Sequence, residues 1–275
     1  MALPPHATGG ERVWYYTFRL LVALVCIYLI FPILTIIPLS FNAGEFLHYP
    51  LKGLSLRWYR EFIEAGRWGV AIKNSFIVGS CSMVLATILG TTAAVGINRT
   101  NFPGKQLLVG LLISPMMIPL VITALALYLF YAKIGLNDTY LGIILAHTIL
   151  GIPFVLITVS ATLQGFDYSL IQAGESLGAS PLEVFFKIVM PNILPGVVSG
   201  AMFAFATSLD EVVVVLFIAG PEHRTLPRQM FSGIREHLSP TFLAVATMLI
   251  VVAGIFMLVL EMLRKRSERL NSSSV

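Results

Sequence analysis

Hydrophobic and charged residues are separated into long blocks along this chain. Six apolar segments contain no Asp, Glu, Lys or Arg, and they cover residues 20–40, 74–98, 106–132, 139–166, 188–209 and 238–260. A helix needs about 20 mostly apolar residues to cross the hydrocarbon of a bilayer. Each segment therefore predicts a membrane-spanning helix, and the fifth extends past two acids to about residue 219. The pattern predicts an all-α membrane protein with six transmembrane helices.

Six spans place both termini on one side of the membrane. The expected parts are an N-terminal segment over 1–19, a transmembrane domain over 20–263 and a basic tail over 264–275. Lys and Arg are equally numerous on the two sides, so their totals do not orient the chain. The densest basic cluster directly follows the last span and consists of Arg264, Lys265, Arg266 and Arg269. Because such clusters favour the cytoplasmic side, we expect both termini in the cytoplasm.

Composition narrows the functional classes. The chain is 57% hydrophobic and 12% charged, with a net charge of +4, whereas soluble domains are near 45–50% apolar and about 25% charged. These values exclude a soluble enzyme and argue against a nucleic-acid-binding protein. The sequence has no G-x-x-x-x-G-K-[ST] phosphate loop and no metal-ligand spacing, so we expect no enzyme activity, cofactor or metal. Energy for transport must then come from a partner or an ion gradient.

Residues 167–191 form the most informative segment. Asp167 is a good helix N-cap, and Gly178 is a natural stop for a helix over 168–177. A second helix is expected from Pro181 to about residue 190, and Pro191 predicts a break before the fifth span.

The sequence contains a strong start signal for that second helix. The string Ser180-Pro181-Leu182-Glu183 is a capping box with proline at the first helical position. Glu183 can pair with Lys187 four residues later. The expected apolar face consists of Leu182, Phe185, Phe186 and Val189. From the residues alone, this hairpin is equally a simple connection between two spans or a docking element for another surface.

The order of residues in the hairpin resembles the E-A-A-x3-G-x9-I-x-L-P signature of ABC-importer permeases. The chain has Gln172-Ala173-Gly174, then three residues to Gly178, nine to Ile188 and one to Met190-Pro191. It departs from the pattern at Gln172, Gly174 and Met190, and the first of these changes removes a charge.

The resemblance implies a type I importer fold with five core helices and one N-terminal helix. It also implies that the loop between spans four and five is a cytoplasmic coupling helix seated in a groove of an ATPase. The implied partners are two copies of that ATPase, a second homologous permease and an extracytoplasmic solute-binding protein, in a bacterial inner membrane. The implied ATPase-coupling residues are Gln172, Ala173, Gly174, Glu175, Gly178, Ala179, Ile188 and Pro191.

A second group of strings resembles the second permease of spermidine/putrescine importers, and permeases for other small solutes share part of it. The strings are Ser208-Leu209-Asp210-Glu211, Ala219-Gly220-Pro221, Thr225-Leu226-Pro227, Ser239-Pro240 and Ala246-Thr247. The entry Lys73-Asn74-Ser75 to the second span is shared more widely among such permeases. The expected function is inward transport of polyamines by alternating access.

Acids inside a membrane segment are costly and usually face a bundle interior or water. Asp210 and Glu211 are such acids, and as neighbours on a helix they would point about 100° apart. Either one could line a cation pathway while the other holds a structural contact, and Asp210 is favoured for the pathway. Tyr128 either belongs to an interfacial aromatic belt or stacks on an amine, whereas His147 predicts a hydrogen-bonded bundle residue.

The alternatives are an ABC importer of another small solute and an ion-coupled secondary transporter in which Asp210 and Glu211 handle protons or cations. The match in the hairpin and the lack of clear inverted repeats argue against the second.

Overall fold

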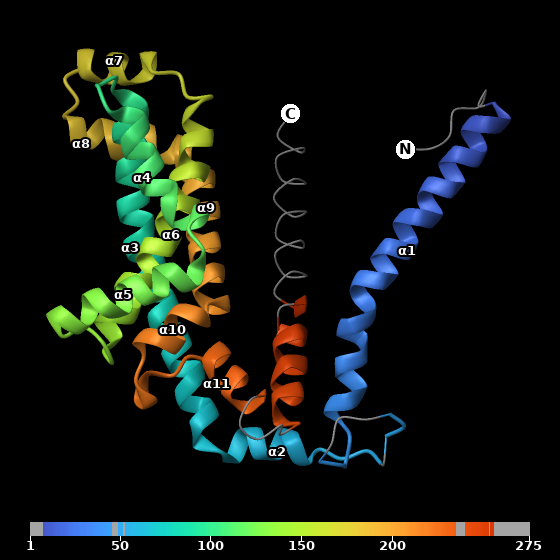
Figure 1. The fold of residues 1–275 in the computed structure, drawn as a ribbon. Coiled ribbons are helices and arrows are strands. Elements are labelled where there is room, and N and C mark those ends of the chain that lie inside the picture. The colour runs from blue at the N-terminus through green and yellow to red at the C-terminus, as the bar shows by residue number, and fades with distance from the viewer. Residues whose placement is uncertain (1–7, 46–48, 52, 235–239, 253, 256–275) are drawn as a thin grey trace. The chain divides into compact units, whose positions relative to one another are not determined.

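The computed structural model describes residues 8–45, 49–51, 53–234, 240–252 and 254–255. Its helices belong to two compact units, residues 66–232 and the remaining two ends of the chain (Figure 1). The basic cluster predicted at 264–269 lies outside the described residues, as do residues 1–7 of the predicted N-terminal segment.

The unit made by the two ends contains α1 (Gly9–Ser40), α2 (Arg57–Glu64) and the apolar helix Thr241–Val252. A capping box between Thr8 and Glu11 starts α1. α1 therefore begins well before the apolar segment predicted at 20–40. Near its other end, the indole N–H of Trp58 in α2 donates to the carbonyl of Asn42 at 2.7 Å.

Three long helices form the core of the unit 66–232. They are α3 (Gly66–Arg99), α6 (Tyr140–Leu163) and α9 (Met190–Asp210), which pack against one another. Glycines allow this close approach: a Cβ at Gly200 of α9 would lie 2.7 Å from the Cα of Val155, and one at Gly90 of α3 would lie 2.6 Å from the Cβ of the same valine. Small residues at helix contacts are typical of membrane bundles, because they let backbones approach.

The third predicted span is not one straight helix. It consists of α4 (Lys105–Met117) and α5 (Leu120–Ile134), which are bent by 104°. Pro119 has no N–H and forces Ile118 into an extended conformation, with φ −79° and ψ 134°. This pair of residues ends the hydrogen-bonded ladder of α4 and is the local reason for the bend.

Four helices are long and apolar enough to cross a membrane, namely α1, α3, α6 and the continuous helix Pro181–Asp210. The bent pair makes a fifth if it counts as one span. For the sixth predicted segment the structure describes Thr241–Val252. Apolar helices thus occupy all six predicted segments, and an all-α membrane fold is confirmed.

The loops of the unit 66–232 gather at two ends. The short helices α7 (Ser169–Ser176) and α8 (Pro181–Val184) lie at one end, beyond the end of α3, while α10 (Val213–Ile218) and α11 (Leu226–Ser232) lie toward the other (Figure 1). At that second end the N–H of Asp138 donates to the carbonyl of Ile218 at 2.9 Å. Within this unit, the α7–α8 hairpin and the α10–α11 segment therefore lie toward opposite ends (Figure 1).

Candidate functional site

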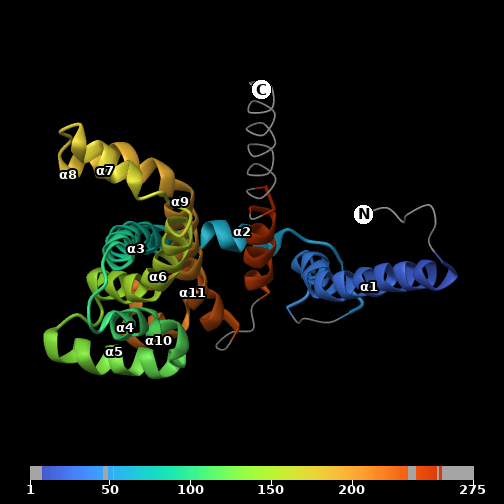
Figure 2. The same cartoon turned by 90° about the horizontal axis from the view of Figure 1, so that it is seen from above.

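The hairpin formed by residues 167–189 extends sideways from the start of α9 (Figure 2). Its first helix, α7, is one residue shorter at each end than predicted, and Tyr168 occupies the N-cap position instead of Asp167. The carboxylate of Asp167 accepts the N–H of Ser169 at 2.9 Å. Hydrogen bonds from the backbone and side chain of Ser169 lower the pKa of Asp167 below its usual value.

Gly178 ends α7 as predicted. Its backbone has φ +83°, a left-handed conformation that favours glycine. The N–H of Ala179 bonds to the carbonyl of Gly174 at 3.1 Å, and the N–H of Gly178 bonds to the carbonyl of Glu175 at 3.0 Å. These two bonds are the pair that defines a Schellman motif, so the turn is fixed by backbone geometry.

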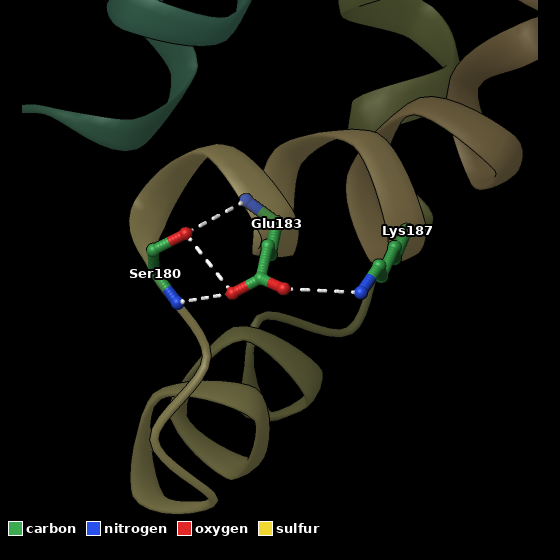
Figure 3. Close-up of polar contacts among 3 residues, drawn as sticks. All are labelled: Ser180, Glu183 and Lys187. Atoms are coloured by element: carbon green, nitrogen blue, oxygen red, sulfur yellow. Dashed lines mark hydrogen bonds and ion pairs between the residues drawn. The ribbon is translucent and has the colours of Figure 1, made fainter.

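The capping box and the ion pair predicted for the second helix are both present (Figure 3). The carboxylate of Glu183 accepts the N–H of Ser180 at 3.0 Å, and the hydroxyl of Ser180 accepts the N–H of Glu183 at 3.4 Å. The ammonium of Lys187 donates to the other oxygen of Glu183 at 3.1 Å. One glutamate thus caps the helix and pairs along it.

The predicted break at Pro191 is wrong. α8 continues through the π-helical turn η1 (Phe185–Val189) directly into α9, which makes one helix over Pro181–Asp210. In the wider turn the N–H of Met190 bonds to the carbonyl of Phe185. Because Pro191 has no N–H, an irregular turn before it lets the helix continue without the missing bond. The hairpin is therefore joined to the fifth span by a continuous helix.

The apolar face of the second helix also differs from the prediction. Val184 and Val189 are buried together with Ile171 of α7, whereas two residues of the predicted face are exposed. The π-helical turn changes the phase of the helix, so a regular period of 3.6 residues does not identify its buried side. The most exposed large apolar side chains of the hairpin are Leu177 at 89%, Leu182 at 71% and Phe186 at 62%.

Two positions of the predicted coupling set meet across the hairpin. Gly174 is buried, and a Cβ on it would lie 2.7 Å from the Cδ1 of Ile188. The glycine at this position therefore leaves room for the end of the Ile188 side chain. The other members of the set lie at the surface or are half-buried: Gln172, Ala173, Glu175, Gly178, Ala179 and Pro191.

Arg99 is a residue of the hairpin region that the sequence did not single out. It is the last residue of α3, and its guanidinium lies 3.4 Å from the carboxylate of Glu175. The pair ties α7 to α3 across a long separation in sequence. The only available signal was a basic residue at the end of a span on the same predicted side as the hairpin.

The two intramembrane acids do not share one helix. Asp210 is the last residue of α9 and is exposed. Glu211 has an extended backbone and is 6% exposed, and its carboxylate accepts the N–H of Val214 at 2.7 Å. The expectation of neighbouring helical positions about 100° apart therefore does not hold. Glu211 caps the short helix α10, while Asp210 is free of such a role.

Tyr128, the third predicted pathway residue, lies on α5 with 41% of its surface exposed. Its carbonyl accepts the side-chain amide of Asn137 at 3.1 Å. Within the part of the chain that the structure describes, no hydrogen bond joins Tyr128 to Asp210 or Glu211.

Comparison with known proteins decides the family. Residues 82–269 match the model of the binding-protein-dependent transport system inner membrane component. The chain belongs to this family. The spermidine/putrescine transport system permease protein PotC of Haemophilus influenzae is 32% identical over 240 residues, which cover 87% of this chain and 93% of PotC. The putrescine transport system permease protein PotI of Escherichia coli is 34% identical over 245 residues, covering 86% of this chain and 87% of PotI.

The permease also shares its fold with a solved structure. A bacterial ABC transporter involved in the import of the acidic polysaccharide alginate has a chain that superposes with a TM-score of 0.72 at 13% identity, covering 95% of this chain and 99% of that one. At this sequence identity the match supports a shared fold and nothing further. It agrees with the type I importer fold expected from the hairpin.

A buried polar network joins the three core helices of the permease. The Nδ1 of His147 in α6 lies 2.6 Å from the hydroxyl of Ser208 in α9, and the hydroxyl of Ser82 in α3 lies 3.3 Å from the same oxygen. His147 is thus a hydrogen-bonded residue of the bundle, as predicted. These hydrogen bonds lie between α6 and α9, where small residues let the two helices approach each other. They therefore strengthen the packing of α9 on α6.

Proposed function

We propose that the permease is driven by a cytoplasmic ATPase that docks on the α7–α8 hairpin. The observation that carries this proposal is the large exposure of the apolar side chains of Leu177, Leu182 and Phe186 on the hairpin. Exposed apolar groups gathered on one element are typical of a protein interaction site. The continuous helix Pro181–Asp210 supports transmission, because a push on the hairpin acts directly on the fifth span.

The residues of the coupling set divide into two roles. Gln172 and Ala173 are exposed on α7 and would face the ATPase. Gly174, Gly178 and Ile188 would hold the shape of the hairpin from within. The complete importer would contain two copies of the ATPase, a second homologous permease and an extracytoplasmic solute-binding protein, in a bacterial inner membrane with both termini of this chain in the cytoplasm.

The transported solute is proposed to be a polyamine, putrescine or spermidine. The names of the relatives PotC and PotI support this class. Asp210 adds a physical reason, because it is exposed at the C-terminal end of α9, where the helix dipole also favours a positive charge. Tyr128 offers an exposed aromatic face for an ammonium group.

The first experiment is purification of the tagged permease in mild detergent from its native host, followed by reconstitution into liposomes with whatever co-purifies. We expect a P-loop ATPase and a second permease, and uptake of putrescine or spermidine that requires ATP and persists with a protonophore. A lone chain whose flux collapses with the ion gradient would instead support an ion-coupled transporter. ATP-dependent uptake of a different solute would overturn only the polyamine assignment.

The role of Asp210 is tested by Asp210→Asn in the reconstituted importer. Removing the charge from the pathway should raise the KM for spermidine about tenfold, equivalent to about 1.4 kcal/mol. The matched control is Asp138→Asn, because Asp138 is an exposed acid whose left-handed backbone, with φ 60°, asparagine also adopts. Equal KM values for the two variants would remove Asp210 from the pathway.

A further inference from the structure

Residues 219–226, here the clamp loop, run from the end of α10 to the first residue of α11 and are held by side chains from three other places. Asn74 of α3 is 1% exposed, and its amide N–H groups donate to the carbonyls of Glu222 at 2.9 Å and Arg224 at 3.0 Å. The hydroxyl of Tyr140, at the start of α6, donates to the amide oxygen of Asn74 at 2.6 Å. The amide of Asn74 thus joins α3, α6 and the clamp loop at one point.

Neighbouring contacts hold the two ends of the same loop. The hydroxyl of Ser75 accepts the N–H of Leu226 at 2.8 Å, and the guanidinium of Arg228 donates to the carbonyls of Ala219 and Gly220. A Cβ on Gly220 would lie 3.0 Å from a carboxylate oxygen of Asp138. The backbone of the loop is therefore bonded along its length, which is unusual for a connection between short helices.

The three hydrogen bonds at position 74 require the amide of asparagine. Its two donors face two main-chain carbonyls while its oxygen faces a hydroxyl donor, so neither a carboxylate nor an apolar side chain of the same size satisfies all three partners. Asn74→Asp would replace the donor with an acceptor facing the two carbonyls of Glu222 and Arg224, and this repulsion should release the loop.

α3 reaches from the clamp loop to the hairpin at the other end of the unit 66–232. The helix has 34 residues and is about 50 Å long, with Asn74 and Ser75 near its start and Arg99, the partner of Glu175 in the hairpin, at its end. Tight glycine contacts hold α3, α6 and α9 together between these points. These contacts connect the hairpin to the clamp loop through α3.

We propose that Asn74 is a positioning residue that makes the clamp loop move as one body with α3, so that the end of the permease opposite the hairpin opens and closes with the ATPase cycle. This proposal rests on the proposed function for the ATPase. The Lys73-Asn74-Ser75 string thereby gains a role in gating: Asn74 and Ser75 hold the loop, and Lys73 is exposed beside them.

The test uses the co-purified importer with spin labels on Glu222→Cys in the clamp loop and Thr92→Cys in α3, both exposed positions, after Cys26→Ser and Cys81→Ser remove the native thiols. In the otherwise unchanged protein we expect a narrow distribution of label distances that is the same without nucleotide and with ATP bound. Adding Asn74→Asp should broaden the distribution. It should also lower uptake at least tenfold while ATP hydrolysis continues.

Two variants separate this role from a general defect. Asn98→Asp makes the same change at the other end of α3, where the amide bonds to Ser160, and should leave the distance distribution narrow. If Asn74→Asp does not assemble, Asn74→Ala takes its place, because it loses the same three hydrogen bonds, and it should also broaden the distribution.

Four outcomes would overturn the proposal: a distribution in the unchanged importer that shifts with ATP, a narrow one in Asn74→Asp, a narrow one in Asn74→Ala where that variant replaces it, or full uptake despite broadening. If the unchanged importer shows no ATP-dependent uptake, the proposed function fails, whereas the distance measurement still decides whether Asn74 holds the loop.

Discussion

A single left-handed residue fixes the corner of the hairpin. A Cβ on Gly178 would meet nothing within 4 Å, so space does not explain the glycine, whereas its φ of +83° does. We expect Gly178→Ala and Gly178→Arg to weaken the turn by about 1–2 kcal/mol. In proteoliposomes of the complete importer, both variants should lower uptake while ATP hydrolysis continues.

The matched variant is Gly178→Asn, because asparagine enters the left-handed region more easily than other residues. It should keep most of the uptake per ATP hydrolysed. If the asparagine variant were as impaired as the alanine variant, Gly178 would act through contact with the partner and not through its backbone conformation.

Gly174 and Ile188 set the spacing between the two arms of the hairpin. Gly174→Ala places a methyl group 2.7 Å from the end of the Ile188 side chain, and that flexible end can move. The overpacking should cost about 1 kcal/mol. Ile188→Val removes the clashing atom, so the double variant should be about 1 kcal/mol more stable than the sum of the single effects. Thermal unfolding of the four proteins in detergent measures this coupling, and simple additivity would contradict the contact.

At the scale of elements, the sequence predicts where apolar helices lie but not how each is interrupted. Charge-free segments identify all six, because burial in lipid demands continuous apolarity. The effect of a proline depends on its surroundings instead. Pro119 ends α4 beside an extended Ile118, whereas Pro191 lies within a continuous helix because the π-helical turn before it lets the helix continue without the missing bond. Hydropathy is similar at both places and does not separate these outcomes.

The close packing of α9 on α6 predicts how a larger residue between these two helices affects stability. A Cβ on Gly200 would lie 2.7 Å from the backbone of Val155, which cannot rotate away. Gly200→Ala should therefore separate the helices at a cost of about 1–3 kcal/mol and lower the melting temperature of the permease in detergent. Gly110→Ala in α4 is the control, since a Cβ there meets nothing within 4 Å. Its stability should stay the same or rise slightly, because alanine favours a helix over glycine.

At the scale of the molecule, local signals predicted the hairpin well and long-range contacts poorly. Ser180, Glu183 and Lys187 lie within two helical turns, so their spacing alone specifies the capping box and the ion pair. The contacts of Arg99 with Glu175 and of Asn74 with the clamp loop join residues far apart in sequence. Such pairs depend on how helices pack, which the order of residues in one chain does not reveal.

The placement of the hairpin and the clamp loop at opposite ends of one unit makes the orientation of the permease testable. In a background without Cys26 and Cys81, we expect Glu222→Cys to react with a membrane-impermeant maleimide in intact spheroplasts. Leu177→Cys, on the exposed tip of the hairpin, should react only after the membrane is opened, because the proposed ATPase side faces the cytoplasm. Each variant is compared with its own fully denatured sample, which corrects for differences in thiol reactivity. Reaction of Leu177→Cys in intact spheroplasts would place the hairpin outside and contradict ATPase docking, whereas protection of both cysteines in opened membranes would show that partners cover these ends.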